Sequence, residues 1–119
     1  MPAPSPSHDA SHDWVGYWRV QRYGGAPPDR PTFYDASLDS WDVLTATDDG
    51  LYEARHPILS VESDVLVLKD EGEPDENTER WRVTADGDRV RVTALTGPHD
   101  GAVGLAERFD ADPRTLTTA

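Results

Sequence analysis

The histidines and the carboxylate clusters are the residues of this 119-residue chain whose types and spacing could support chemistry. His8 and His12 are four residues apart with carboxylates beside them, a spacing that would suit Zn²⁺ or Ni²⁺ on a helix. Their segment is rich in proline and serine, so we expect a flexible tail that binds metal weakly. The acidic run 70–76 could attract Ca²⁺, but it contains Pro74 and lacks the ligand pattern of an EF-hand. We therefore expect no metal site and no cofactor.

An enzyme needs acid–base or nucleophilic groups in a recognisable arrangement. His56 and His99 fall in or beside loops, where an imidazole could act as an acid or a base. Asp42, Asp64 and Glu107 fall on or near expected strands, and one of them could point into the interior as a buried carboxylate. The chain has no serine or cysteine nucleophile motif and no glycine-rich phosphate loop. These observations favour a protein that is not an enzyme, and the alternative is a small-barrel enzyme acting on an apolar substrate.

Arginines and apolar residues alternate along two neighbouring segments, 80–85 and 89–94, which are separated by Asp86-Gly87-Asp88. Strict alternation with a glycine-containing turn predicts a β-hairpin with one buried and one exposed face. The arginine face could bind an anion, but cross-strand pairing with the surplus carboxylates is the simpler interpretation. The expected inward residues are Trp81, Val83, Val90 and Val92, and the expected outward residues are Arg80, Arg82, Arg89 and Arg91.

The charge balance is strongly acidic, with 23 acidic residues against 11 basic ones and a net charge of −12. Such a chain repels nucleic acid and anionic membranes, so we expect neither as a partner. An acidic protein from a GC-rich genome would use arginine in place of lysine, as this chain does. The excess of aspartate over glutamate favours a second interpretation, a halophilic protein whose carboxylates are screened by salt. There is no cysteine, which excludes disulfides and thiolate metal sites.

Short runs of alternating apolar residues, separated by turn residues, predict an all-β fold of seven or eight strands. A sheet this long with one apolar face must close on itself, so we expect a small antiparallel up-and-down barrel, with a two-sheet β-sandwich as the alternative. Pro57 is expected to interrupt the chain between two strands. Three segments are open or short: 32–34 as a strand, 35–39 as a helical turn, and 115–117 as a terminal strand.

The first expected strand contains Gly16-Tyr17-Trp18, and the last contains Arg108. This pair of motifs resembles lipocalins and small bacterial lipocalin-like domains, in which a Gly-x-Trp strand opens the barrel and an arginine packs across the tryptophan ring. The resemblance implies that Trp18 and Arg108 form a structural pair at one barrel end through a cation–π contact. It also implies a barrel that holds a small hydrophobic ligand.

The candidate ligand-binding residues are aromatic and aliphatic side chains of the expected strands. They are Tyr17, Trp18, Trp41, Val43, Tyr52, Val67, Trp81 and Val83. Neighbours such as Tyr17 and Trp18 face opposite ways, so this set outlines a pocket rather than one wall. A third hypothesis is a structural or interaction domain whose core is filled by the same aromatic residues, and a cavity of at least about 300 Å³ would argue against it.

We expect residues 1–12 to be a disordered tail and residues 13–119 to form a single domain. No run of about 18 apolar residues is present to span a membrane. The start of the sequence lacks a basic region followed by an apolar run. We expect a cytoplasmic protein if the chain is complete, and an exported or lipid-anchored one if a signal lies upstream. The oligomeric state is not indicated.

Overall fold

The computed structural model of the chain describes residues 13–97 and 100–117. The expected tail of residues 1–12, with His8 and His12, and the loop residue His99 lie outside the described residues.

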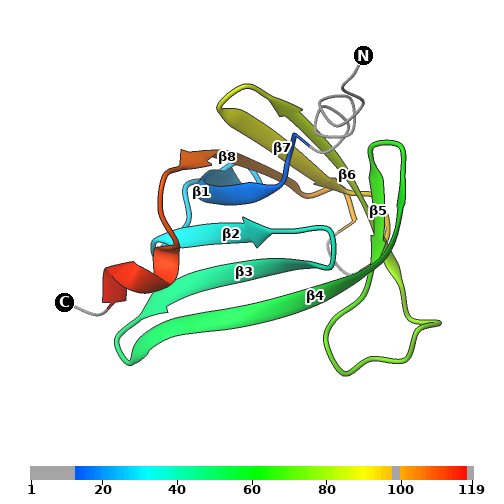
Figure 1. Cartoon of the computed structure of the whole chain (residues 1–119), viewed down its shortest axis with the longest axis horizontal. Coiled ribbons are helices and arrows are strands. Elements are labelled where there is room, and N and C mark those ends of the chain that lie inside the picture. Colours follow the sequence, from blue (N-terminus) through cyan, green and yellow to red (C-terminus); the bar gives the residue numbers. More distant parts are fainter. Residues whose placement is uncertain (1–12, 98–99, 118–119) are drawn as a thin grey trace, which may run out of the picture.

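Eight antiparallel strands close into one barrel, in which every strand pairs with its neighbours in sequence and β1 pairs with β8 (Figure 1). The strands are β1 (Gly16–Tyr23), β2 (Thr32–Ala36), β3 (Ser40–Thr47), β4 (Gly50–Glu62), β5 (Val65–Leu68), β6 (Glu79–Asp86), β7 (Arg89–Ala94) and β8 (Val103–Phe109), followed by a 3₁₀ helix, η1 (Pro113–Thr117). The all-β barrel prediction is confirmed, and the β-sandwich alternative is wrong. Among the described residues, no helix is long and apolar enough to cross a membrane.

The hairpin β6–β7 has the two faces that its alternation predicted. Val83, Val90 and Val92 are buried in the core, and Trp81 packs against it. The four arginines that alternate with these residues along the two strands are exposed. Alternation decides the faces because successive side chains of a strand point to opposite sides of the sheet.

The connections of an up-and-down barrel gather alternately at its two ends. Segments 13–15, 37–39, 63–64 and 87–88 meet at one end, which we call the tryptophan end because Trp14 and Trp18 lie there. Segments 24–31, 48–49, 69–78, 95–97 and 100–102 meet at the other, which we call the loop end. The longer connections are all at the loop end.

Two local expectations fail for identifiable reasons. Asp35 and Ala36 belong to β2, so the helical turn expected at 35–39 is absent. Instead, the hydroxyl oxygen of Ser37 accepts hydrogen bonds from the backbone N–H groups of Asp39 and Ser40, with N–O distances of 3.3 Å and 3.2 Å. Such serine turns satisfy the backbone without a helix.

Pro57 does not separate two strands as expected, because the single strand β4 continues through it. Pro57 is the last residue that pairs with β3, opposite Ser40, and the next residue, Ile58, already pairs with β5. A proline lacks an N–H to donate, and it is tolerated where a strand changes partners.

The expected terminal strand 115–117 is also wrong, since these residues belong to η1. In Figure 1 this helix (red) lies beside β2 and β3. Arg114 fastens it to the outer face of the barrel by ion pairs with Asp35 (2.8 Å), Asp42 (3.5 Å) and Glu53 (2.9 Å). Residues 115–117 cannot add a strand to the sheet, because the closed barrel has no free strand edge to pair with.

Candidate functional site

A pocket of about 580 Å³ opens inside the barrel toward the loop end. Most of its lining is apolar or aromatic, which suits a small organic ligand. The lining residues are Val20, Tyr23, Ala26, Pro27, Pro28, Asp29, Thr32, Tyr34, Val43, Ala54, His56, Trp81, Val92, Ala94 and Ala102. The barrel is therefore not completely filled by its own side chains.

One wall of the pocket is part of a cluster of aromatic rings in tilted and edge-to-face contact. Tyr34 and Trp81 line the pocket, and both contact Trp41, with ring centres 5.1 Å and 6.3 Å from it. Trp41 is fully buried, and its indole N–H has no hydrogen-bond partner among the described residues. Packed rings of this kind have low conformational freedom, so the wall is rigid before any ligand arrives.

The Tyr34 hydroxyl lies against Gly104 on β8, where a Cβ would come within 2.5 Å of it. Gly104 therefore leaves the space that the phenol occupies. Burial raises the pKa of Tyr34, and the neighbouring Tyr23 phenol raises it further. Burial also raises the pKa of Tyr23. Both phenols stay protonated at neutral pH and can donate hydrogen bonds, but they cannot act as bases there.

His56 forms part of the wall through its ring. Its Nδ1 donates to the Trp41 carbonyl oxygen at 2.9 Å, and its Nε2 lies 3.4 Å from an Asp70 carboxylate oxygen in the β5–β6 loop. The imidazole also packs on Trp81, with ring centres 5.0 Å apart. Since both nitrogens have protein partners, His56 is held in place as a positioned wall residue.

The structure brings two of the eight predicted ligand-binding residues, Val43 and Trp81, to the pocket. Trp41 contacts the wall residues Tyr34 and Trp81 but does not itself line the pocket. Trp18 and Val83 are buried in the core without lining the pocket. All three side chains belong to the core of the barrel, but the pocket does not extend as far as they do.

The other three predicted residues lie elsewhere. Tyr17 faces outward beside η1, where burial and the nearby carboxylates of Asp112 and Asp35 raise its pKa. Val67 pairs with Ser60 and Arg80 on the outer face of the sheet. Tyr52 is 64% exposed near the β3–β4 turn, beyond the lined part of the pocket.

Sequence reasoning missed Tyr23, Tyr34 and the loop residues 26–29 as lining residues. Tyr34 carried a usable signal, because it follows Thr32 and Phe33 in a short β-prone run. That run is too short for the sequence alone to show which of its side chains face inward. The loop residues carried no such signal, since their position depends on how the β1–β2 connection folds over the mouth.

The predicted pair Trp18 and Arg108 is in contact at the tryptophan end. The Arg108 guanidinium lies 3.9 Å from the centre of the Trp18 ring, and Trp18 is fully buried. Arg108 also donates to the carbonyl oxygens of Val15 and Asp13, both at 2.9 Å. This end of the barrel is thus closed by a tryptophan and a cation.

Of the three carboxylates considered for the interior, only Asp42 is buried, and none lines the pocket. Asp42 faces the outer side of β3, where it accepts a hydrogen bond from Ser40 and pairs with Arg55 and Arg114 at 3.5 Å each. Asp64 pairs with Arg82 at 3.4 Å, and Glu107 is exposed.

The arginine face of β6–β7 pairs partly with carboxylates. Arg80 lies 3.1 Å from Glu62 and Arg82 lies 3.4 Å from Asp64, both pairs exposed. Within residues 13–97 and 100–117, no group of three or more His, Cys, Asp or Glu side chains is arranged to hold a metal ion.

Comparison with known proteins agrees with this geometry at the level of the fold. No family model matches the sequence, and no curated protein matches it. Among solved structures, a lipocalin-like protein from Bacteroides uniformis superimposes with a TM-score of 0.59 over 82% of this chain and 99% of that chain, at 16% identity. The chain therefore has a lipocalin-like barrel fold, as the Gly-x-Trp and arginine motifs predicted.

Proposed function

We propose that this protein binds a small, predominantly apolar ligand in the barrel pocket, without catalysing a reaction on it. The observation that carries the proposal is the pocket of about 580 Å³ between a rigid aromatic wall and an aliphatic one. Pockets of about 300–1,000 Å³ with this kind of lining are typical of small-molecule sites. The volume argues against a filled structural core.

The phenols and the imidazole of the lining support binding rather than acid–base chemistry. The phenols of Tyr23 and Tyr34 have raised pKa values and stay neutral. Both nitrogens of His56 have protein partners. An enzyme acting on an apolar substrate would need a group inside the cavity that is free to exchange a proton with it. The remaining titratable side chain of the lining, Asp29, is exposed in the β1–β2 loop.

Decan-1-ol, a neutral apolar probe, tests the proposal through the tryptophan fluorescence of the native protein. Trp81 lines the pocket, so we expect a saturable change at micromolar concentration and a rise in melting temperature with probe concentration. A hydrophobic probe that gives neither effect would contradict the proposal.

Two variants on one strand separate the pocket from the surface. Val92 lines the pocket, and its neighbour Arg91 is exposed on the outer face of β7. Val92→Phe extends a ring into the cavity and should weaken decanol binding at least about tenfold. Arg91→Phe adds a ring of the same size outside and should leave binding within about twofold of the native protein. Equal binding by both variants would place the probe outside the barrel.

A further inference from the structure

Among the residues that the structure describes, the pocket lining contains one fixed charge, and it is negative. Asp29 lies in the β1–β2 loop at the mouth, and no lysine or arginine of residues 13–97 and 100–117 lines the cavity. Within the part of the chain that the structure describes, the Asp29 carboxylate has no ion pair and no hydrogen bond. An unpaired carboxylate beside an apolar cavity is free to pair with a charge on a ligand.

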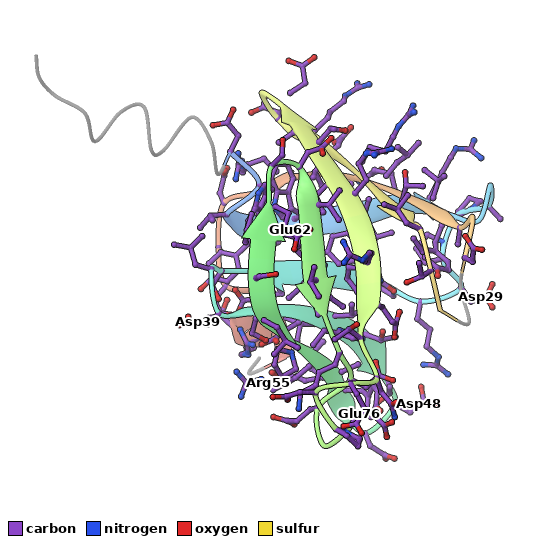
Figure 2. The ribbon with its side chains drawn as sticks, turned by 90° about the vertical axis from the view of Figure 1, so that its right-hand side faces the viewer. Asp29, Asp39, Asp48, Arg55, Glu62 and Glu76 are labelled. Carbon is purple, nitrogen blue, oxygen red and sulfur yellow. The ribbon has the colours of Figure 1, made fainter. Side chains whose placement is uncertain are left out.

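The loops around the mouth have the same sign of charge. Their carboxylates are Asp29, Asp48, Asp49, Asp70, Glu71, Glu73, Asp75, Glu76 and Asp100, against Arg30 and Lys69 as basic residues. In the view of Figure 2, Asp29 lies at the right and Asp48 and Glu76 lie at the lower right, whereas Asp39 of the tryptophan end lies on the left. Acidic loops around a low-dielectric opening concentrate cations and repel anions.

The cations near the mouth are already engaged. Arg30 pairs with Asp48 at 3.3 Å, and Lys69 pairs with Asp75 at 2.8 Å. Arg22, at the end of β1, donates to the Gly25 carbonyl oxygen at 3.1 Å. None of the three lines the pocket, so an anionic ligand head group would meet no positive partner there.

From these observations we propose that the pocket selects organic cations, that is, apolar molecules carrying a protonated or quaternary amine at one end. The proposal rests on the proposed function and specifies its ligand class. The apolar body lies among the aliphatic and aromatic walls, and the ammonium group lies at the mouth beside Asp29. The faces of Tyr23 and Tyr34 add cation–π attraction for an ammonium group that reaches deeper into the pocket.

Three probes with the same chain and different head groups test this ligand class: decylamine, decan-1-ol and decanoate at pH 7. Binding is measured by tryptophan fluorescence and calorimetry at submicellar concentration. We expect decylamine to bind at least tenfold more tightly than decan-1-ol, a difference of about 1.4 kcal/mol, and decanoate to bind most weakly. Raising the salt concentration to about 1 M should reduce the preference for the amine, because exposed charges are screened.

Variants locate the selectivity. Asp29→Asn should lower decylamine affinity at least about fivefold and leave decan-1-ol affinity within about twofold. Asp49→Asn is the matched control: it removes one loop-end charge that does not line the pocket, and it should leave both affinities within about twofold. Val92→Phe should abolish decylamine binding if the amine occupies the cavity.

The outcomes separate this proposal from the one on which it rests. If all three probes bind equally, or decanoate binds best, the cation proposal is wrong and the binding function stands. If decylamine binds Val92→Phe as it binds the native protein, the amine sits on the acidic surface and the proposal is again wrong. If no probe binds, the binding function itself fails. An amine preference that survives Asp29→Asn would contradict the assignment to Asp29.

Discussion

Arg108 lies across the ring of Trp18, with the guanidinium carbon 3.9 Å from the ring centre, although the two residues are ninety positions apart in the sequence. Trp18 in turn donates its indole N–H to the Trp14 carbonyl oxygen at 2.8 Å. The contact joins the first strand to the last, at the seam where the barrel closes. Its loss should therefore act on closure of the whole sheet.

Replacing Trp18 with alanine should lower the free energy of unfolding by about 3–5 kcal/mol, because it removes a fully buried ring from the core. Arg108→Ala should cost less, about 2–3 kcal/mol, through the lost stacking and the two lost carbonyl contacts. Urea denaturation followed by tryptophan fluorescence gives both values. A larger loss for Arg108→Ala than for Trp18→Ala would contradict the assignment of the ring as the main contributor.

Gly16 is required by the same contact. Its φ of +137° is a conformation that side chains rarely adopt, and a Cβ there would lie 2.7 Å from an Arg108 guanidinium nitrogen. We expect Gly16→Ala to lower the free energy of unfolding by about 1–3 kcal/mol. Gly87→Ala serves as a control with backbone strain alone, since it also has a positive φ but open space around it. If both variants lose the same stability, the steric part of the argument is wrong.

Arg114 should stabilise the protein more than an ordinary surface arginine, because its ion pairs join η1 to β2, β3 and β4 and help to neutralise the buried Asp42. Arg114→Met should cost about 1–3 kcal/mol. Arg30→Met, which breaks an exposed pair with Asp48, should stay within about 1 kcal/mol of the native protein. Thermal and urea melts of the two variants side by side make the comparison.

The same cluster predicts a pH dependence through Asp112. The backbone N–H of Arg114 and then its guanidinium lower the pKa of Asp112 below its ordinary 3.8. A carboxyl group with a lowered pKa in the folded state contributes stability above its unfolded pKa, and that contribution is lost as the pH falls through the folded value. Asp112→Asn should therefore lose stability less steeply than the native protein between about pH 4 and pH 2. Parallel slopes in urea melts across this range would contradict the prediction.

The net charge of −12 predicts that stability rises with salt well above physiological ionic strength. Screening relieves repulsion among the carboxylates, which outnumber the available cations. Melting temperatures in about 0.1 M and about 3 M KCl measure the effect. An unchanged or lower melting temperature in the concentrated salt would argue for the GC-rich interpretation and against adaptation to salt.

Several features could be predicted from the sequence because they depend on neighbours along the chain. The two faces of β6–β7 follow from alternation, since a strand turns each successive side chain to the opposite side. The contact between Trp18 and Arg108 does not depend on neighbours along the chain, and it was implied by the resemblance of the two motifs to those of lipocalins. The closed barrel followed from many short strands with one apolar face, which need to remove their edges.

The pocket and its charge were decided by the tertiary structure. Val43 and Trp81 reach the cavity while Trp41 stays behind them, although all three belong to the inward faces of their strands. How far a side chain lies from the mouth depends on strand register and on sheet curvature. The alternation of apolar and polar residues along one strand predicts neither. The positions of Asp29 and Arg114 were decided in the same way. Asp29 lines the pocket because of how the β1–β2 loop folds. Arg114 reaches carboxylates on three strands, of which Asp35 is 79 and Glu53 is 61 residues away in the sequence. Contacts at that separation form only when the whole sheet closes, so no local pattern predicts them.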